Sequence, residues 1–374
     1  MKRVIIIGNA SYNTLSAIRS FGEGQIPIVL IMVDEHDPLF IRKSRYLNKR
    51  NLYIVDSLDK CEEILNTLKS DGEDQMLMTI FDTAAEWVDE REPELSKFFC
   101  TPCRGKQIGK LFHKDEQCKL AEECGLTVPK SVVYHRGDTL PIGIEYPILT
   151  KPLVSSLGRK WDIHICNDEN ELNNALQEDS LCDDFIIQEY MEKDFEINCI
   201  GVKTENETNL FLLRKIRQWP SKTGLSSFVY LDRIEKYNIN KKCIESFLNK
   251  VGYNGLFSVE FIHKNGINYF LEVNFRNDLM TYSVTAGGVN PHAVYFAGGT
   301  NIDMNKLHQV YVMNTSNDLL HVKSRSLSWK QWFSDFFKTS TFINFNKRDL
   351  MPTFWYYLRK ILLILKIERY FHFY

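Results

Sequence analysis

The sequence of 374 residues has no long uninterrupted apolar run, and this absence bears first on membrane topology. No segment reaches the roughly 18 apolar residues that a membrane-spanning helix needs. The apolar run near the start, Val4–Ile7, is too short for the core of a signal peptide. We therefore expect no transmembrane segment and a cytoplasmic protein.

Closely spaced cysteine pairs are also scarce. The nine cysteines are an odd number, and Cys100 and Cys103 form a CxxC pair that is followed only by the more widely spaced Cys118 and Cys124. A zinc site of the usual type needs a second close pair, so zinc is not predicted. Without a secretion signal, the cysteines are expected to be reduced thiols.

The sequence lacks a basic excess as well as a dinucleotide-binding motif. The net charge of −2 argues against a general nucleic-acid binder. The turn Gly8–Ser11 does not have the GxGxxG pattern, so no NAD site is predicted there. A hydrophobic content of 44% is typical of a globular protein, and 374 residues favour two or three domains.

Residues 1 to about 100 alternate between strand and helix patterns. The predicted strands are Val4–Gly8, Pro27–Asp34 and Met76–Phe81, and the predicted helices are Tyr12–Phe21, Cys61–Lys69 and the mostly helical Thr83–Phe99. Alternating units of this kind predict a parallel α/β sheet.

The middle of the chain contains strands whose ends carry charged residues. The predicted strand 146–152 contains Lys151 near its end and is followed by the polar loop 155–160. Lysines at strand ends beside such a loop are suited to hold phosphate oxygens. Further predicted elements are strands 161–166, 185–191, 195–202 and 210–217 and helices 115–124, 169–177 and 243–251, of which 115–124 is expected to end at Gly125.

The stretch Leu256–Asp278 reads as a hairpin with acids where apolar residues are expected. Glu260 lies among Val259, Phe261 and other apolar residues, and Glu272 is followed at period two by Asn274 and Arg276. A carboxylate in an apolar strand is costly unless it is paired or holds a cation. Oxygen ligands of this kind suit Mg²⁺ bound together with phosphates.

The residues alone leave the hairpin open between two interpretations. A two-residue turn at Asn265–Gly266 would pair Glu260 with Leu271 and turn Glu272 to the opposite face. A three-residue loop beginning at Lys264 would instead bring both glutamates to one face, so a metal site is expected to require an odd-length loop. The other interpretation is an edge hairpin whose acids face water.

The order and spacing of these segments resemble the ATP-grasp superfamily. Within it, the chain is similar to the carboxylate–amine ligases related to carbamoyl-phosphate synthase, biotin carboxylase and D-alanine–D-alanine ligase. The resemblance covers residues 1 to about 312 and rests on HKDEQCKLAEECGLTVPKS, YPILTKP, IIQEYMEKDFE, LRKIRQWPSKTG and VEF…LEVNFRND. The interval of twelve residues between Glu260 and Glu272 is one that the family uses.

The resemblance implies a mixed α/β and α+β architecture. The expected domains are an N-terminal parallel α/β domain (1–105) and a two-subdomain ATP-grasp domain (106–315), followed by a mostly helical C-terminal extension (316–374). The ATP-grasp domain would divide into a small nucleotide-binding part (106–190) and a large metal-binding part (191–315).

The resemblance also implies roles for individual residues. The metal ligands would be Glu260, Glu272 and Asn274, and the catalytic cations Arg276, Lys215 and Arg217. Glu189 and the backbone through Met191 would face adenine, and Glu196 the ribose. The full set expected to bind the nucleotide is Lys114, Lys151, Ser155, Ser156, Gly158, Glu189, Tyr190, Met191, Glu196 and Lys215.

The implied activity is ATP-dependent ligation of a carboxylate to an amine through an acyl phosphate, with Mg²⁺, or Mn²⁺ as an alternative ion. The runner-up is a non-catalytic, ATP-binding regulatory protein. The expected partners are small-molecule substrates and no nucleic acid, and homodimers are frequent in the family.

The chain departs from the family pattern at two places: the phosphate loop has a single glycine, Gly158, and Phe275 stands where the family often has proline. Substrate selection is expected from Trp219–Phe228 and Asp278–Asn290, with Tyr282, Thr285 and His292 as unranked candidates.

The C-terminal segment combines aromatic, aliphatic and basic residues. Arg359, Lys360, Lys366 and Arg369 interrupt an apolar helical pattern after residue 353. This pattern fits either a helix packed on the body of the protein or one in peripheral contact with a membrane surface. Packing is favoured, because apolar positions extend around most of the helix.

Overall fold

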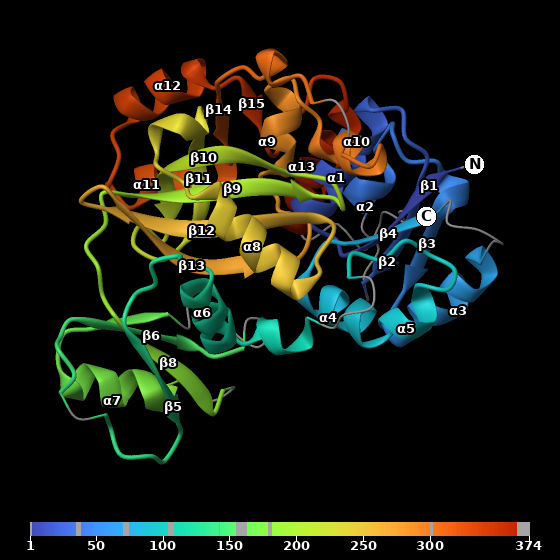
Figure 1. Cartoon of the computed structure of the whole chain (residues 1–374). Helices are drawn as coiled ribbons and strands as arrows, with labels where there is room; N and C mark the ends of the chain where they lie inside the picture. The colour runs from blue at the N-terminus through green and yellow to red at the C-terminus, as the bar shows by residue number, and fades with distance from the viewer. Residues whose placement is uncertain are drawn as a thin grey trace.

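The computed structural model describes residues 2–34, 39–69, 75–103, 108–141, 143–154, 163–178, 182–299 and 302–364. In these residues the chain forms a parallel sheet and two largely antiparallel sheets, with helices packed against each of them (Figure 1). This mixed α/β arrangement agrees with the predicted fold class. The domain boundaries expected from the sequence stay predictions.

The N-terminal sheet has the order β3-β2-β1-β4, and all its pairs are parallel. Neighbouring residues of β1, such as Ile5 and Ile6, belong to apolar clusters on opposite faces, which explains the continuous apolar run. The predicted βα alternation is confirmed, and β3 is an addition to it. The elements are β1 (Arg3–Gly8), α1 (Tyr12–Glu23), β2 (Ile28–Val33), α2 (Leu39–Arg42), β3 (Leu52–Val55), α3 (Asp59–Leu68), β4 (Gln75–Thr79), α4 (Asp82–Glu90) and α5 (Glu92–Leu95).

A small antiparallel sheet has the order β5-β8-β6-β7 and carries α7 on one face. It lies at the lower left in Figure 1, beneath the large sheet. Lys151 lies in β6 and Glu189 ends β8, so both charged residues belong to this sheet. The elements are α6 (Lys114–Glu123), β5 (Ser131–His135), β6 (Ile148–Pro152), β7 (His164–Cys166), α7 (Glu169–Glu178) and β8 (Asp184–Glu189).

The large sheet has the order β13-β12-β9-β10-β11-β14-β15. Helix α8 contributes Phe247 and Leu248 to the apolar cluster on one face, and α9 and α10 contribute Val284 and Tyr295 to the cluster on the other. The elements are β9 (Phe195–Lys203), β10 (Thr208–Trp219), β11 (Leu225–Asp232), α8 (Lys241–Val251), β12 (Leu256–Lys264), β13 (Ile267–Asn274), α9 (Thr281–Ala286), α10 (Pro291–Phe296), β14 (Val310–Met313) and β15 (Thr341–Phe342).

The hairpin of β12 and β13 corrects the expectation of an odd-length loop. Lys264 pairs with Ile267, so the turn has two residues, and both Asn265 (φ 51°) and Gly266 (φ 79°) adopt the left-handed conformation of a type I′ turn. A β-bulge then changes the register, because Phe261 pairs with Phe270 whereas Glu260 pairs with Glu272. Leu271 is the extra residue, and it restores both glutamates to one face.

The C-terminal helices are α11 (Thr315–Lys323), α12 (Trp329–Lys338) and α13 (Leu350–Ile364). Helix α11 packs on β10 and β11, and α13 packs on α2. The ring of Tyr356 in α13 contacts those of Tyr12 and Phe40. The predicted packing of this helix on the body is therefore confirmed over 350–364. Among the described helices, none combines the length and the apolar character that a bilayer span requires.

Candidate functional site

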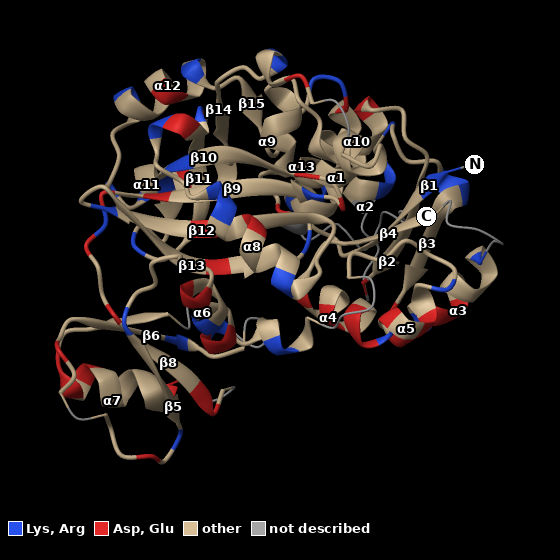
Figure 2. Cartoon of the chain, viewed as in Figure 1, with Lys and Arg blue, Asp and Glu red and all other residues tan. Residues whose placement is uncertain are grey.

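A cavity of about 480 Å³ lies where the three sheets approach one another. This volume is within the range of small-molecule sites. Its lining includes residues of the loops after β1 and β4, of β6 and β8 in the small sheet, and of β9, β10, β12 and β13 in the large sheet. Figure 2 shows that acidic and basic residues interrupt the otherwise uncharged strands of the large sheet.

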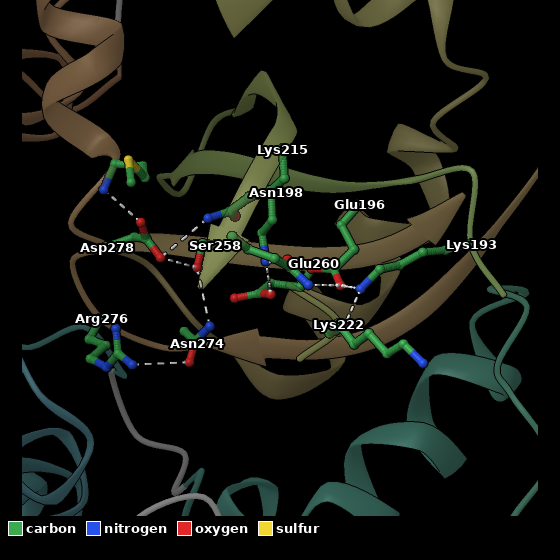
Figure 3. A network of polar contacts seen from close by, with 12 residues as sticks. Lys193, Glu196, Asn198, Lys215, Lys222, Ser258, Glu260, Asn274, Arg276 and Asp278 are labelled. Carbon is green, nitrogen blue, oxygen red and sulfur yellow. Dashed lines mark hydrogen bonds and ion pairs between the residues drawn. The ribbon is translucent and has the colours of Figure 1, made fainter. Parts of the chain in front are cut away.

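The polar side chains of the large sheet form neighbouring rows on one face. Glu260 pairs with Glu272 on one side and with Asn198 of β9 on the other. In the next row, Ser258 pairs with Asn274. Alternate residues of a strand share one face. Of these five residues, all except Ser258 line the cavity. The carboxylate pair and the amides therefore face the same space, and Figure 3 shows Glu260, Asn198 and Asn274 of this group.

Lys215 of β10 forms ion pairs with two carboxylates that line the cavity, those of Glu196 and Glu260. Its Nζ donates to Glu196 Oε2 at 2.9 Å and to Glu260 Oε2 at 2.7 Å, and its side chain is only 7% exposed. Burial alone would raise the pKa of Glu196, but Lys215 and Lys193 outweigh that effect and hold it well below its usual value. Burial likewise opposes the charge of Lys215, yet Glu260 and Glu196 raise its pKa. The group thus stays ionised.

Arg276 lies at the other end of the hairpin, toward the N-terminal sheet. Its guanidinium donates to Asp82 Oδ1 at 2.6 Å and Oδ2 at 3.2 Å, and to Asn274 Oδ1 at 3.2 Å. Asp82 begins α4, so the contact joins the large sheet to the first domain region. Both Arg276 and Asp82 line the cavity, and the pair fixes the guanidinium at its edge.

The sequence reasoning missed Asn198 and Asp278. Asp278 Oδ2 accepts from Ser258 Oγ at 3.1 Å and from Asn198 Nδ2 at 3.4 Å. Asn198 is 3% exposed, and its Oδ1 has no hydrogen-bond partner among the described residues. Buried acceptors normally have a hydrogen-bond partner, so this oxygen is a candidate to bind a ligand, an ion or a water molecule. The period of two from Glu196 on β9 was the sequence signal that could have identified Asn198.

The small sheet, α6 and the connection to β9 contribute most of the predicted nucleotide-binding residues that the structure describes; Glu196 and Lys215 lie in the large sheet. Lys114 and Lys151 both line the cavity and are mostly buried, and Lys114 Nζ donates to Pro152 O at 2.9 Å. Glu189 Oε1 accepts from Lys130 N at 2.8 Å. Tyr190 and Met191 follow on the segment that connects this sheet to β9, and they also line the cavity. Ser155, Ser156 and Gly158 lie outside the described residues.

Arg217 is a predicted catalytic residue that the structure does not bring to the cavity. Its guanidinium donates to Asp318 at 3.0 and 2.8 Å and to Asp335 at 2.6 Å, so it is directed toward α11 and α12. The β-bulge between Lys215 and Arg217 contributes to the difference in direction between these two side chains. Arg217 therefore joins the C-terminal helices to the sheet and is not in the described lining of the cavity. Its catalytic role stays a prediction.

The three unranked selectivity candidates also lie away from the cavity lining. Tyr282 donates to Glu23 at 2.6 Å, Thr285 shares a hydrogen bond with Ser20 at 2.8 Å, and His292 is fully buried against Phe21. These contacts join α9 and α10 to α1. Their role is in packing between elements, as the partners on α1 show.

The donors that face the cavity fit a hard cation better than a soft one. Within the described residues, no group of three or more His, Cys, Asp or Glu side chains is arranged to hold a metal ion by itself. Glu260, Glu272 and Asn274 instead offer carboxylate and amide oxygens on paired strands, and the unpartnered Oδ1 of Asn198 lies beside Glu260. A mixed oxygen set of this kind suits Mg²⁺.

Comparison with known proteins gives partial sequence matches and broad structural ones. No family model matches the chain. The formate-dependent phosphoribosylglycinamide formyltransferase of Prochlorococcus marinus strain AS9601 is 26% identical over 171 residues, covering 44% of this chain and 43% of the relative. The same enzyme of strain MIT 9301 is 30% identical over 139 residues, covering 36% and 35%. The matches thus span less than half the length of these curated relatives.

Solved structures match most of the chain. N5-carboxyaminoimidazole synthetase from Staphylococcus aureus complexed with ADP gives a TM-score of 0.65 at 15% identity, covering 87% of both chains. L-amino acid ligase from Bacillus licheniformis gives 0.60 at 12%, covering 82% of this chain and 76% of that one. The biotin carboxylase domain of Hydrogenobacter thermophilus 2-oxoglutarate carboxylase, with MgADP, gives 0.63 at 15%, covering 83% and 73%. At these identities the comparison establishes a shared fold.

Proposed function

We propose that this chain, which has the ATP-grasp fold, is an ATP- and Mg²⁺-dependent ligase that joins a carboxylate to an amine through an acyl phosphate and releases ADP and phosphate. The observation that carries the proposal is the pairing of Glu260 with Glu272 beside Asn198 on the cavity wall. Facing carboxylates on neighbouring strands repel each other unless cations compensate them. Lys215 supplies one such cation, and a bound metal ion would supply more.

Metal binding is proposed for Glu260, Glu272 and Asn274, with Asn198 as an additional donor. A bound Mg²⁺ would supply charge neutralisation and orientation of the phosphate oxygens. The protein's own contribution is a set of oxygens on paired strands, whose relative positions the strand pairing fixes. Lys215 holds Glu260 and Glu196 in place, so we assign it a positioning role in addition to its predicted phosphate contact.

Nucleotide binding is proposed for the residues around the connection between β8 and β9. Lys114 and Lys151 approach from the small sheet side and would offset negative charge on the phosphates. Tyr190 and Met191 would contact the base through their backbone and apolar surface. Glu196, already ionised by its lysine partners, would accept hydrogen bonds from ribose hydroxyls.

Acyl transfer requires a cation near the reacting carboxylate. Arg276 is oriented by Asp82 and by Asn274, so its guanidinium needs little rearrangement to stabilise charge that develops on the substrate. The substrate carboxylate oxygen would attack the γ-phosphorus and release ADP. The amine nitrogen would then attack the acyl carbon, expel phosphate and lose its proton to solvent or to a nearby base.

The end of the cavity beside the N-terminal sheet indicates the kind of substrate. Its described lining includes Asn9, Ser11, Asn13, Ile80, Phe81 and Asp82, and Arg276 contacts Asp82 at this end. Anionic groups are held well by an arginine, and neutral polar groups by amides and hydroxyls. We therefore propose that the substrate at this end carries a carboxylate that Arg276 holds, together with further hydrogen-bonding groups.

The alternative is a non-catalytic ATP-binding regulatory protein. A regulator needs the nucleotide and metal contacts but not a cation for a second substrate such as Arg276, since binding without phosphoryl transfer does not require a positioned second substrate. The presence of Glu260, Glu272 and Arg276 around one cavity favours the ligase. Turnover distinguishes the two functions.

The test combines nucleotide binding with phosphate release. We expect calorimetric titration with a non-hydrolysable ATP analogue to show Mg²⁺-dependent binding that Glu272→Gln abolishes, whereas Glu235→Gln, on the surface outside the cavity, leaves it unchanged. Phosphate release should then depend on a pooled carboxylate and amine supply. Binding without such release would favour the regulator, and binding indifferent to Glu272→Gln would reject the metal site.

A further inference from the structure

The solvent-facing side of α13 carries a row of apolar side chains from Leu350 to Ile361. Leu350, Phe354 and Ile361 are 52%, 56% and 52% exposed, and Met351 and Tyr357 are 48% and 41% exposed. Positions 350, 354, 357 and 361 follow the spacing of one helix face. A surface helix normally directs polar residues outward, whereas the outward face of α13 carries this apolar stripe.

The inward side of the same helix is already occupied. Tyr356 packs its ring against Tyr12 and Phe40, and Trp355 lies beneath the ammonium of Lys43. The exposed stripe is therefore not available to the protein's own core. A surface of another kind must cover it if it is to be removed from water.

Basic residues lie on the segments next to α13. Residues 39–55 include Arg42, Lys43, Arg45, Lys49 and Arg50 but no aspartate or glutamate. Arg45, Lys49 and Arg50 are exposed, as are Lys347 just before α13 and Lys360 within it. Helix α13 packs on α2, which lies within 39–55, so the basic segment adjoins the helix that carries the stripe.

Hydrogen bonds fix the two parts relative to each other. Asp349 directs its carboxylate inward, where it accepts from Arg19 Nε at 3.1 Å, Ser44 Oγ at 2.9 Å and Arg45 N at 2.9 Å. Arg45 also donates to Arg348 O at 3.3 Å. The acid nearest the helix start is thus 1% exposed. Arg348 forms an ion pair with Glu23 at 3.2 Å, so the positive charge of the surface comes mainly from the other exposed lysines and arginines.

We propose that α13 and the basic segment 39–50 form a docking surface for an anionic lipid bilayer. The apolar stripe would enter the interface between headgroups and acyl chains, with the helix parallel to the membrane plane. The surrounding lysines and arginines would contact anionic headgroups. From Leu350 to Ile361 the helix rises about 16 Å, long enough to place several apolar side chains at one depth.

Charge distinguishes this occupant from a second copy of the chain. A two-fold contact through the same surface would bring the basic segments of two copies close together, and like charges in such an interface are unfavourable. An anionic bilayer complements both features at once, since it offers an apolar interior and a negative surface.

The test is cosedimentation of the full-length protein with vesicles of phosphatidylcholine alone or with 30% phosphatidylserine. We expect binding to the anionic vesicles that weakens with salt. Phe354→Gln combined with Ile361→Gln should weaken it about tenfold or more, and so should Lys49→Gln combined with Arg50→Gln. All four side chains are on the surface, so folding is expected to be retained and can be checked by thermal unfolding.

Matched controls come from other exposed surfaces. Phe337→Gln alters an aromatic residue on α12 that is 82% exposed, and Lys241→Gln with Lys242→Gln removes two neighbouring charges from α8. These variants should bind as the wild type does. Failure of the full-length protein to bind anionic vesicles at low salt would overturn the proposal, as would equal weakening by the controls. Concentration-dependent self-association that the stripe variants abolish would overturn it in favour of a dimer interface.

Discussion

At the scale of single residues, buried charges in this protein are compensated by named partners. Lys215 neutralises Glu196 and Glu260, and Arg276 neutralises Asp82. Breaking such a pair is costly because it leaves a charge buried without compensation. The ion pairs of the candidate site therefore also stabilise the large sheet. A mutation in the site can lower both stability and ligand binding, so the two must be measured separately.

The pH dependence of stability should reveal the Glu196 pair. Its folded-state pKa is depressed, so the carboxylate contributes stability that is fully present above its unfolded pKa of about 4.5 and is lost as pH falls toward the folded value of about 2. We expect urea unfolding of wild type to lose stability between these values. Glu196→Gln should show a shallower loss over the same range, whereas identical slopes would contradict the paired state.

Arg217 provides a prediction that separates packing from catalysis. Its partners Asp318 and Asp335 have side chains only 0% and 7% exposed. Arg217→Met should lower the free energy of unfolding by about 3 kcal/mol or more, because two carboxylates lose their cation. Calorimetry on the folded variant should give unchanged affinity for the Mg²⁺–ATP analogue. A large loss of that affinity at normal stability would instead support a role of Arg217 in the candidate site.

At the scale of secondary structure, the hairpin of β12 and β13 shows how a turn and a bulge together set a register. The two-residue turn alone would direct Glu272 away from Glu260. The extra residue, Leu271, corrects the register before the strands reach the glutamates. The rest of the hairpin keeps its apolar residues in the cluster beneath α8.

Substitution in the turn tests this arrangement. Gly266 has φ of 79° and no neighbouring atom within 4 Å of an added Cβ, so Gly266→Ala would meet backbone strain without a clash. We expect a loss of about 1 kcal/mol in unfolding free energy, measured by denaturant titration, with nucleotide affinity retained. Asn265→Gly should be tolerated. A gain in stability for Gly266→Ala would show that the turn differs from type I′.

At the scale of the whole molecule, the cavity is a junction of three sheets. Its lining comes from segments as distant in sequence as Asn9 and Asn317. A ligand that contacts all three sheets binds the folded state and not the unfolded chain, so it should stabilise the entire structure.

Thermal unfolding measures this coupling. At a concentration of a non-hydrolysable ATP analogue about one hundredfold above its dissociation constant, with Mg²⁺ present, we expect about 2.7 kcal/mol of stabilisation and a rise in melting temperature. Adding a chelator should remove most of the effect. Lys151→Met should reduce it at equal ligand concentration, whereas Lys242→Met, on the exposed side of α8, should not. An unchanged melting temperature in wild type would argue against a nucleotide site in this cavity.

The sequence by itself determined the features that depend on local spacing. The alternation of strand and helix in the first hundred residues, the period of two on β9, β12 and β13, and the order of the charged residues are properties of neighbouring positions, so they could be read without a fold. These features were sufficient to predict the parallel α/β sheet of the first hundred residues, and the family resemblance implied the mixed architecture of the rest. They also identified Glu260, Glu272 and Lys215. In the structure Lys215 forms an ion pair with Glu260 (Figure 3), and Glu272 pairs with Glu260 across the hairpin.

Only the tertiary structure decided which distant groups meet. The bulge at Leu271, the inward turn of Arg217 toward Asp318, and the approach of Asp82 to Arg276 each depend on partners far away in the sequence. The same holds for the apolar stripe of α13, whose exposure follows from which face packs on α2. Local periodicity states that a residue shares a face with its neighbours, but the partner across that face is selected by the packing of the whole chain.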